Sequence, residues 1–320
     1  MIYRNLEDSD IVSIYELWEE SIKDEIFKLD DYELFKNKIY HKEYYNKEGT
    51  VVVEDINTII GFGICYFISE ERSHIGMIVV NEKYRKQGVG TKILNLLEEY
   101  LINKNAKYIR NFYVSPLNFR WNIPLYGEHY HTGCPAILIN SKIYFLLANN
   151  GYNIESIMDG YHINLKNFEF SKKIKERKEL LEKEGITIEY YNKNNHLGLK
   201  EFFERLNNKG FERTALSNAE KENPSPMLVV IYDNKVYGWT GPLSVDNELK
   251  ASFGGIAVDE RFRSKGVGKV LFSSLCQGLK DMGGEYTTLF TGVDNVARNI
   301  YLSAGFKIVM SFALMKKSFV

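Results

Sequence analysis

The chain has 320 residues, of which 44% are hydrophobic and 26% charged, a composition typical of a globular protein with one large domain or two of ordinary size. Its formal net charge of −1 provides no basic field that would favour nucleic acid or an anionic membrane as a partner. Three widely spaced cysteines make no disulfide framework, no run of about 18 apolar residues could span a membrane, and no signal-peptide pattern is present. We therefore expect a cytoplasmic protein.

The first half of the chain predicts alternating strands and amphipathic helices. Ser9 or Asp10 would cap the first helix, because apolar residues recur on one stripe from Ile11 to Trp18. The predicted elements are a strand at 2–4, helices at 10–21 and 32–45, strands at 50–54 and 59–68 and a third ending at 80, a helix at 90–103 and a strand at 108–114.

The second half follows a charged segment, 171–185, which predicts a solvated linker helix ended by Gly185. The predicted elements after it are a strand at 186–190, helices between 196 and 222, strands at 227–232, 236–244 and 249–258, a helix at 268–282, a strand at 287–291, a helix ending at 304 and a strand at 306–313.

One stretch of the sequence occurs twice. The segment from Gly76 to Gly90 aligns without a gap with the segment from Gly254 to Gly268, at an offset of 178 residues. The identical positions include Arg85 with Arg263 and the whole Gly-Val-Gly triplet. Since this period is the size of a domain and far longer than a solenoid repeat, it predicts two tandem copies of one fold.

The repeated segment reads as a strand, a tight loop with two glycines and a helix. Such a loop leaves unpaired backbone N–H groups at the start of the helix, where the helix dipole also favours an anion such as a diphosphate. Other nucleotide-binding loops do not fit. Walker A would need glycine at Arg263 and Ser or Thr at Val270, and the dinucleotide pattern would need glycine at Ile93 and Leu271.

These features resemble the acetyl-CoA-binding core of the GNAT superfamily of N-acetyltransferases. Its loop pattern, Arg/Gln-x-x-Gly-x-Gly/Ala, is matched by Arg263, Gly266 and Gly268. A second family segment, Asn-x-x-Ala-x-x-x-Tyr-x-x-x-Gly-Phe, is matched by the run from Asp294 through Tyr301 to Phe306, with Asp in place of the usual Asn. The resemblance implies an α+β fold of two tandem GNAT-like domains, each a mixed, mostly antiparallel sheet flanked by helices. We place them at 1–167 and 186–320, with a linker helix at 168–185.

The resemblance also implies acetyl-CoA as acyl donor and a set of site residues. Tyr301 would lie beside the cofactor sulfur and assist the departing thiolate, by hydrogen bonding rather than by full proton transfer, because a phenol is a weaker acid than a thiol. The residues implied to bind the cofactor are Ile256, Ala257, Val258, Arg263, Ser264, Lys265, Gly266, Val267, Gly268, Lys269 and Asp294. A possible second site comprises Ile78, Val79, Val80, Arg85, Lys86, Gln87, Gly88, Val89, Gly90 and Thr91.

The two copies differ in the region after the loop. The N-terminal copy has Leu147 where the C-terminal copy has Tyr301, so it would be a cofactor-binding or structural relative of a catalytic C-terminal copy. It also carries an insertion, 115–139, that is either functional or a cover for a sheet edge. Tyr126 or Tyr130 of this insertion is an alternative acid for the N-terminal copy. The insertion's His129, His131 and Cys134 have metal-like spacing, but without a further ligand cluster we expect no metal.

The general base and the acceptor are not specified by these motifs. Asp246, Glu248, Glu212 or a water chain are candidates for the base. We expect an N-acetyltransferase that acts on an amine of a small molecule or peptide by direct attack in a ternary complex, as a monomer with an internal pseudo-dimer. The alternatives are a non-catalytic acetyl-CoA-binding regulator or sensor and, less favoured, transfer of a longer acyl group.

Overall fold

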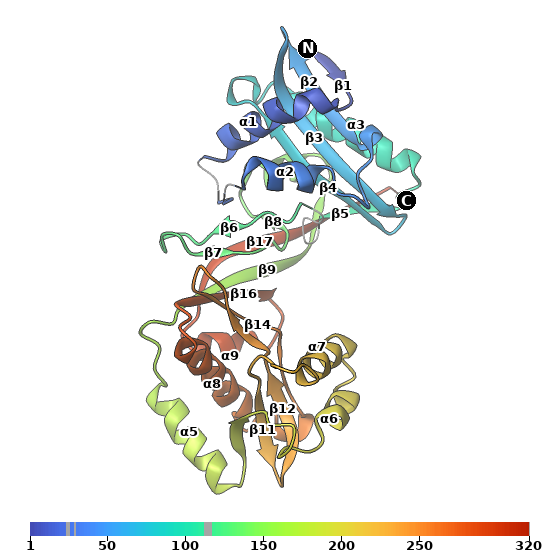
Figure 1. Cartoon of the computed structure of the whole chain (residues 1–320). Coiled ribbons are helices and arrows are strands. Elements are labelled where there is room, and N and C mark those ends of the chain that lie inside the picture. Colours follow the sequence, from blue (N-terminus) through green and yellow to red (C-terminus); the bar gives the residue numbers. More distant parts are fainter. Residues whose placement is uncertain (24–25, 29, 112–116, 320) are drawn as a thin grey trace. The chain divides into compact units, whose positions relative to one another are not determined.

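A computed structural model describes residues 1–23, 26–28, 30–111 and 117–319 (Figure 1). The chain divides into two compact units that are not continuous in sequence. The first comprises Met1–Gly160, Phe290–Val293 and Val309–Val320, and the second comprises Tyr161–Leu289 and Asp294–Ile308. Within the described ranges, the structure contains no helix with the length and apolar character needed to cross a lipid bilayer.

The first unit is built on an antiparallel sheet with helices on both faces. Because side chains alternate across a strand, Val51 and Val53 of β2 pack toward α3, whereas Val52 packs in the cluster formed by α1 and α2. The sheet has the order β1-β2-β3-β4. Its elements are β1 (Ile2–Arg4), α1 (Ile11–Ile22), α2 (Tyr32–Ile39), β2 (Thr50–Asp55), β3 (Thr58–Ser69), β4 (Arg72–Val80) and α3 (Val89–Asn103).

The remainder of the first unit comes from distant parts of the chain. The C-terminal strand pairs antiparallel with β5, where Lys316 lies opposite Arg110, and with β8, where Phe312 lies opposite Leu138. These elements are β5 (Tyr108–Asn111), β6 (Trp121–Asn122), β7 (Tyr130–His131), β8 (Ile137–Leu138), α4 (Lys142–Asn149), β9 (Asn153–Asn164) and β17 (Lys307–Ser318). The first unit therefore takes its last strand from the C-terminal end of the chain.

The second unit repeats the plan of a sheet between two helical layers. On β11, Val230 packs toward α8 and Val229 packs toward α6 and α7. The sheet has the order β10-β11-β12-β15. The elements are α5 (Lys172–Lys183), β10 (Thr187–Tyr190), α6 (Leu199–Leu206), α7 (Lys209–Ala219), β11 (Leu228–Tyr232), β12 (Lys235–Thr240), β13 (Leu243–Val245), β14 (Lys250–Phe253), β15 (Ile256–Val258), α8 (Val267–Asp281), β16 (Tyr286–Gly292) and α9 (Arg298–Ser303).

The structure confirms the predicted α+β class and the internal repeat. Helices α3 and α8 have the same length and begin and end at positions 178 residues apart, and β5 and β16 begin at the same offset. The copies differ at two of these strands. Strand β4 is continuous whereas its counterpart is divided into β14 and β15 at Gly254 and Gly255, and β3 is continuous whereas its counterpart is divided into β12 and β13. At the first division the backbone passes close to α7, since a Cβ on Gly255 would lie 2.6 Å from the Phe211 ring.

Four predicted elements were wrong in their extent. The strand predicted at 249–258 is the divided pair β14 and β15, and the one predicted at 236–244 is interrupted between β12 and β13 by Pro242, which has no N–H for a ladder. The helix predicted at 32–45 ends at Ile39, and the rings of Tyr40 and Tyr45 then pack 4.9 Å apart. The last strand extends to Ser318. The part of the strand predicted at 112–114 lies outside the described residues.

Candidate functional site

The two repeated loops have the same backbone geometry. Gly88 before α3 has φ +83° and Gly266 before α8 has φ +78°, a conformation that favours glycine. The helical hydrogen bonds of α3 begin with the Lys92 N–H, which donates to the Gly88 carbonyl at 2.9 Å. The N–H groups that precede it in the first turn have no intrahelical acceptor. The start of α3 therefore has N–H groups that an anion could accept from, and the anion site at each loop stays a prediction.

A groove of about 880 Å³ runs along β4 in the first unit, and we call it the β4 groove. This volume lies in the range of sites for small molecules and cofactors. Strand β4 from Ile75 to Val80 forms its length, and the start of α3 closes one part of it. From the predicted second site, the groove includes Ile78, Val79, Val80, Arg85, Lys86, Gly88, Gly90 and Thr91.

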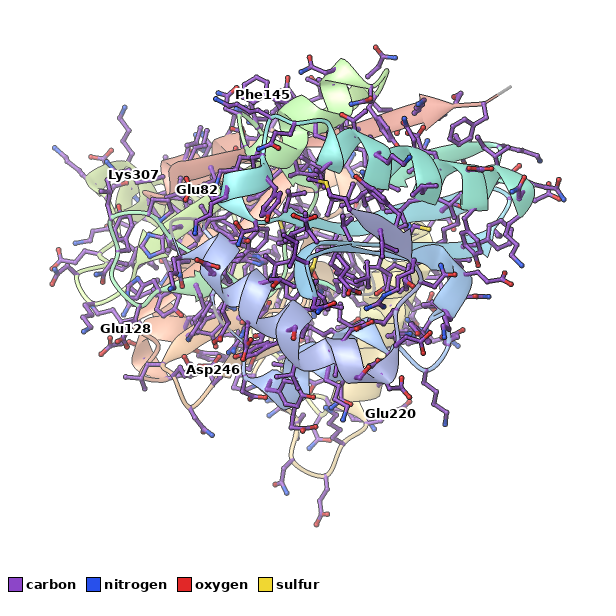
Figure 2. All side chains as sticks on the ribbon, turned by 90° about the horizontal axis from the view of Figure 1, so that it is seen from above. Glu82, Glu128, Phe145, Glu220, Asp246 and Lys307 are labelled. Carbon is purple, nitrogen blue, oxygen red and sulfur yellow. The ribbon has the colours of Figure 1, made fainter. Side chains whose placement is uncertain are left out.

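The charged end of the β4 groove is formed by the loop before α3 and by α4. Arg85 Nε donates to the Val80 carbonyl at 2.9 Å, which fixes the side chain against the end of β4. Lys86 and Lys142 add two further cations, and Glu82 one carboxylate. Phe145, which is exposed on α4, also lines the groove. Figure 2 labels Phe145 together with Glu82. Cations beside unpaired N–H groups at a helix start would attract a phosphate.

Asn111 of β5 lies among the residues that line the groove. Its Oδ1 accepts a hydrogen bond from the Ile75 N–H at 3.1 Å, which ties β5 to β4. The side chain is only 1% exposed, and its Nδ2 has no hydrogen-bond acceptor among the described residues. A buried polar group left unpaired costs about 1–3 kcal/mol. This position therefore offers a spare donor beside the groove.

The insertion forms one wall of the β4 groove. Phe119, Cys134, Ala136, Ile137 and Leu138 contribute to the lining. The Cys134 thiol donates to the Ala136 carbonyl, and burial raises its pKa to about 12, so it stays protonated. The metal-like pattern is otherwise used in packing, since the His131 ring stacks 5.7 Å from Trp121.

Neither of the insertion's candidate acids lines the β4 groove. The Tyr126 ring stacks on His129, and Tyr130 is buried beneath the Lys28 ammonium, 4.0 Å from its ring centroid. The described residues that line the groove include no tyrosine. Leu147 lies on α4 and is fully buried in the core.

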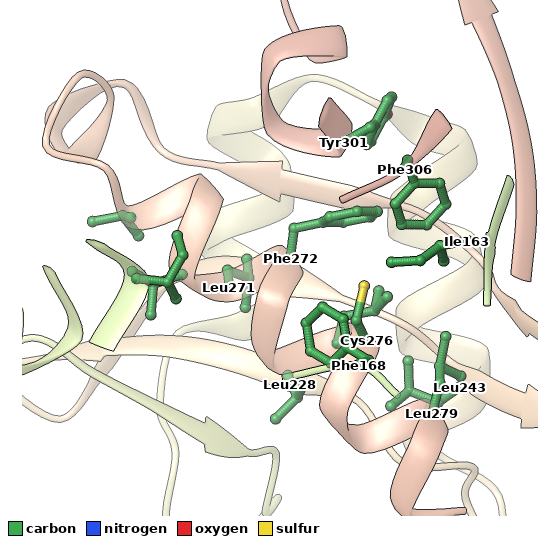
Figure 3. Packing of buried hydrophobic residues seen from close by; sticks show 14 of the residues in the cluster. Ile163, Phe168, Leu228, Leu243, Leu271, Phe272, Cys276, Leu279, Tyr301 and Phe306 are labelled. Carbon is green, nitrogen blue, oxygen red and sulfur yellow. The ribbon is translucent and has the colours of Figure 1, made fainter. Parts of the chain in front are cut away.

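Tyr301 lies on α9 in the aromatic core of the second unit (Figure 3). Its ring is 5.7 Å from that of Tyr161 and 5.0 Å from that of Phe272, and the residue is 8% exposed. Burial raises the pKa of the Tyr301 phenol above its ordinary value. The phenol therefore stays protonated and can donate a hydrogen bond, but it is a poor proton donor.

The loop of the second unit contacts the linker helix, whereas no described residue lies within 4 Å of a Cβ placed on Gly88 in the first unit. A Cβ on Gly266 would lie 3.2 Å from atoms of the Arg177 side chain on α5, and Lys265 pairs with Glu184 at 3.8 Å. Arg263 Nη1 lies 3.4 Å from Glu260 Oε1. Of the remaining predicted residues, Ser264 lies in the loop, and Val267, Gly268 and Lys269 form the first turn of α8. Strand β15, with Ile256, Ala257 and Val258, pairs with β12.

The other predicted positions of the second unit lie in turns or at a helix start. Asp294 is exposed, and the turn there is capped by Asn295, whose Oδ1 accepts from the Ala297 N–H at 2.9 Å. Asp246 Oδ1 accepts the N–H groups of Glu248 and Lys250 at 2.9 Å in the turn between β13 and β14. Glu212 on α7 pairs with Lys209 at 2.8 Å. Asp246 and Glu212 thus each have a structural contact.

Sequence reasoning missed much of the β4 groove. Trp18 was assigned to the core, and it packs there while also lining the groove. Met77, Asn111 and the residues of α4 from Ser141 to Asn149 were not singled out. The aromatic insertion is the sequence feature that could have indicated the groove, because a functional role is one of the two predicted for it.

Comparisons with known proteins agree with the fold and the loops. A model of the acetyltransferase (GNAT) family matches residues 11–129 and 192–306, one region in each copy. A GCN5-related N-acetyltransferase from Sphaerobacter thermophilus has a similar fold, with 13% identity over 99% of this chain and 95% of that chain and a TM-score of 0.61. A search of curated proteins gave no match.

Two further solved structures are similar over 99% of this chain. One is a tandem GNAT protein from the clavulanic acid biosynthesis pathway, with 10% identity, 98% of that chain covered and a TM-score of 0.57. The other is a GCN5-related glucosamine N-acetyltransferase region in a fungal multi-domain β-N-acetylglucosaminidase, with 16% identity and a TM-score of 0.62. This chain covers 38% of that fungal chain. At these identities the likeness concerns the fold alone.

Proposed function

Because this chain belongs to the acetyltransferase (GNAT) family, we propose that it is an acetyl-CoA-dependent N-acetyltransferase and that acetyl-CoA lies in the β4 groove. The acceptor is an amine of a small molecule or peptide that attacks the acetyl carbonyl directly in a ternary complex. Attack by the neutral amine forms the C–N bond and breaks the C–S bond, and the proton that the nitrogen releases neutralises the departing thiolate to give CoA as a thiol. The cytoplasmic location and the monomeric state remain predictions.

The observation that carries this proposal is the β4 groove beside a loop of the family pattern. The N–H groups at the start of α3 would receive the diphosphate, with Arg85 and Lys86 nearby as cations. The backbone of β4 from Ile78 to Val80 would hold the pantetheine arm. Asn111 Nδ2 would satisfy its missing hydrogen bond with a carbonyl of the bound donor. The chain thus contributes orientation, exclusion of water and donors placed in advance.

For the second unit we keep the role predicted from the sequence, in which a second acetyl-CoA would bind at the loop before α8 and react there. Tyr301 would donate a hydrogen bond to the departing thiolate, and its raised pKa suits a donor that keeps its proton. No carboxylate lies on β15, so an acceptor with an α-amino group is the better match. Such an amine has a pKa near 8 and needs only about 1–1.5 kcal/mol to be neutral at pH 7, compared with roughly 4.6 kcal/mol for a lysine-like amine.

A second function is favoured by one observation. The described lining of the β4 groove includes no tyrosine, and Leu147 replaces the catalytic position in that copy. The groove would then bind acetyl-CoA without turning it over, as a regulator or sensor.

A thiol-release assay tests both functions. The full chain is mixed with acetyl-CoA and a panel of amines, and free CoA is followed with a thiol reagent while acetyl-CoA binding is measured by calorimetry. We expect binding together with amine-dependent release of CoA. Binding without release for any amine would favour the sensor, and the absence of both would refute the proposal.

A further inference from the structure

The β4 groove passes from one face of the sheet to the other. Ile75, Ile78 and Val80 of β4 belong to the hydrophobic cluster under α3, whereas Met77 and Val79 belong to the cluster under α1 and α2. All five line the groove. The groove therefore extends from the α3 side, where the loop and its cations lie, to the α1 side.

The α1 side of the groove is an apolar chamber. Its walls are aromatic and aliphatic side chains from α1, the segment after α1, β4 and the insertion, namely Trp18, Ile22, Phe27, Met77, Val79 and Phe119. Trp18 and Phe119 stack with ring centroids 5.1 Å apart, and Phe27 packs edge-on at 6.0 Å. The charged side chains among the described lining, Glu82, Arg85, Lys86 and Lys142, come from the loop before α3 and from α4.

Buried charges hold the chamber in shape. Asp30, whose side chain is fully buried, accepts from Arg120 Nε at 3.1 Å and from Arg120 Nη2 at 3.0 Å. Lys38 Nζ lies 3.2 Å from the second Asp30 oxygen, donates to the Leu117 carbonyl at 2.9 Å and sits 5.0 Å from the Phe119 ring centroid. These contacts fasten the insertion to α2, so Phe119 is fixed in the chamber wall before any ligand arrives.

We propose that the β4 groove takes as its acceptor an amine carried on an apolar group of aromatic size, which fills this chamber. The inference rests on the proposed function, which assigns the α3 side to the CoA moiety and leaves the α1 side to the second substrate. Buried aromatic walls reward apolar surface and offer a polar acceptor no replacement for its lost water. The acceptor's ammonium finds no carboxylate in the described chamber wall, so the amine loses its proton before it enters.

The test compares two amines of similar basicity, benzylamine and ethanolamine. Their binding to the full chain is measured by calorimetry, with and without saturating CoA, in the wild type and two α1 variants. Ser21→Trp fills the chamber from a half-buried position that lines the groove, and Val12→Trp adds the same bulk at an exposed position of α1. We expect benzylamine to bind at least tenfold more tightly, Ser21→Trp to remove this preference, and Val12→Trp to retain it.

Equal affinities, or a preference that survives Ser21→Trp, would overturn the inference. The inference would also be overturned if the chamber received the acyl chain of the donor. In that case decanoyl-CoA would bind more tightly than acetyl-CoA in the wild type but not in Ser21→Trp. Failure of the proposed function has a different signature, because CoA and acetyl-CoA would then not bind at all. The amine measurement without CoA still decides the inference in that case.

Discussion

The two glycine loops have the same backbone geometry but different surroundings. Both begin a helix of the same length after a glycine of positive φ. In the first unit, α4 and the insertion leave an open groove beside the loop. In the second unit, Arg177 of the linker helix lies against Gly266, and Tyr301 is packed among aromatic rings. The motif thus determines how a phosphate would be held, while the segments around it determine what else can bind.

The family pattern and the groove draw attention to different copies. The C-terminal copy matches more of the family pattern, including Tyr301, whereas the N-terminal copy contains a groove of cofactor size. The following predictions separate the two copies.

Removing the buried charge that fastens the insertion should have the largest effect. Asp30→Ala leaves Arg120 and Lys38 without their shared carboxylate, and breaking such a buried pair costs about 3 kcal/mol or more. Urea denaturation followed by tryptophan fluorescence measures the loss in the free energy of unfolding. Glu33→Ala, an exposed carboxylate on α2, is the control. A loss for Asp30→Ala no larger than that of the control would contradict the role of the insertion.

The second prediction compares the same substitution, glycine to aspartate, in the two loops. Gly90→Asp places a carboxylate where the diphosphate would lie, and its Cβ would be 3.6 Å from Leu146, an ordinary contact. We expect at least a hundredfold loss of acetyl-CoA affinity, or about 2.7 kcal/mol, in calorimetry. Gly268→Asp should leave the binding at the β4 groove unchanged. If Gly268→Asp weakens acetyl-CoA binding and Gly90→Asp does not, the cofactor site lies in the second unit. Gly90→Ala and Gly268→Ala control for the added Cβ.

The phenol of the second unit can be removed without changing the loop. Tyr301→Phe should lower turnover by tenfold or more with little change in acetyl-CoA affinity, because a hydrogen bond to the leaving thiolate is lost. Tyr161→Phe is the matched control, since it removes a neighbouring phenol that accepts from Arg298 Nε at 3.0 Å. Unchanged turnover in Tyr301→Phe, or equal losses in both variants, would refute a catalytic role.

The smallest expected effect is a pH dependence of stability that arises from Asp259, beside the loop of the second unit. The hydrogen bonds from Arg261, with a further one from Arg205, hold the pKa of Asp259 well below its ordinary value, whereas the equivalent residue in the first unit is the uncharged Asn81. A lowered pKa contributes stability above the unfolded value near 3.9 that is lost as pH falls below it. The gap in urea midpoint between the wild type and Asp259→Asn should therefore narrow from pH 6 to pH 3. A constant gap would contradict this.

The sequence predicted what local chemistry determines. The boundaries of α3 and α8 fell within about one residue, because a left-handed glycine starts each helix and an apolar stripe continues it. It could not predict features that depend on contacts distant in sequence. The close approach of Gly255 to Phe211 of α7 and the pairing of Lys316 with Arg110 both join residues far apart in the chain.

The groove itself was beyond the reach of motif reasoning for the same reason. Its walls come from α1, β4, the insertion and α4, which no sequence pattern brings together. The burial of Tyr301 among Tyr161, Phe272 and Phe306 is likewise a tertiary property. The pattern predicted that a tyrosine would stand at this position, and the packing around it had to come from the structure.

A crystal structure of the full chain with CoA tests the central claim most directly. We predict electron density for the pantetheine arm along Ile78–Val80 of β4, with the diphosphate against the backbone N–H groups from Gly88 to Thr91. A β4 groove left empty at saturating CoA, whether or not the ligand is found at α8, would contradict this account.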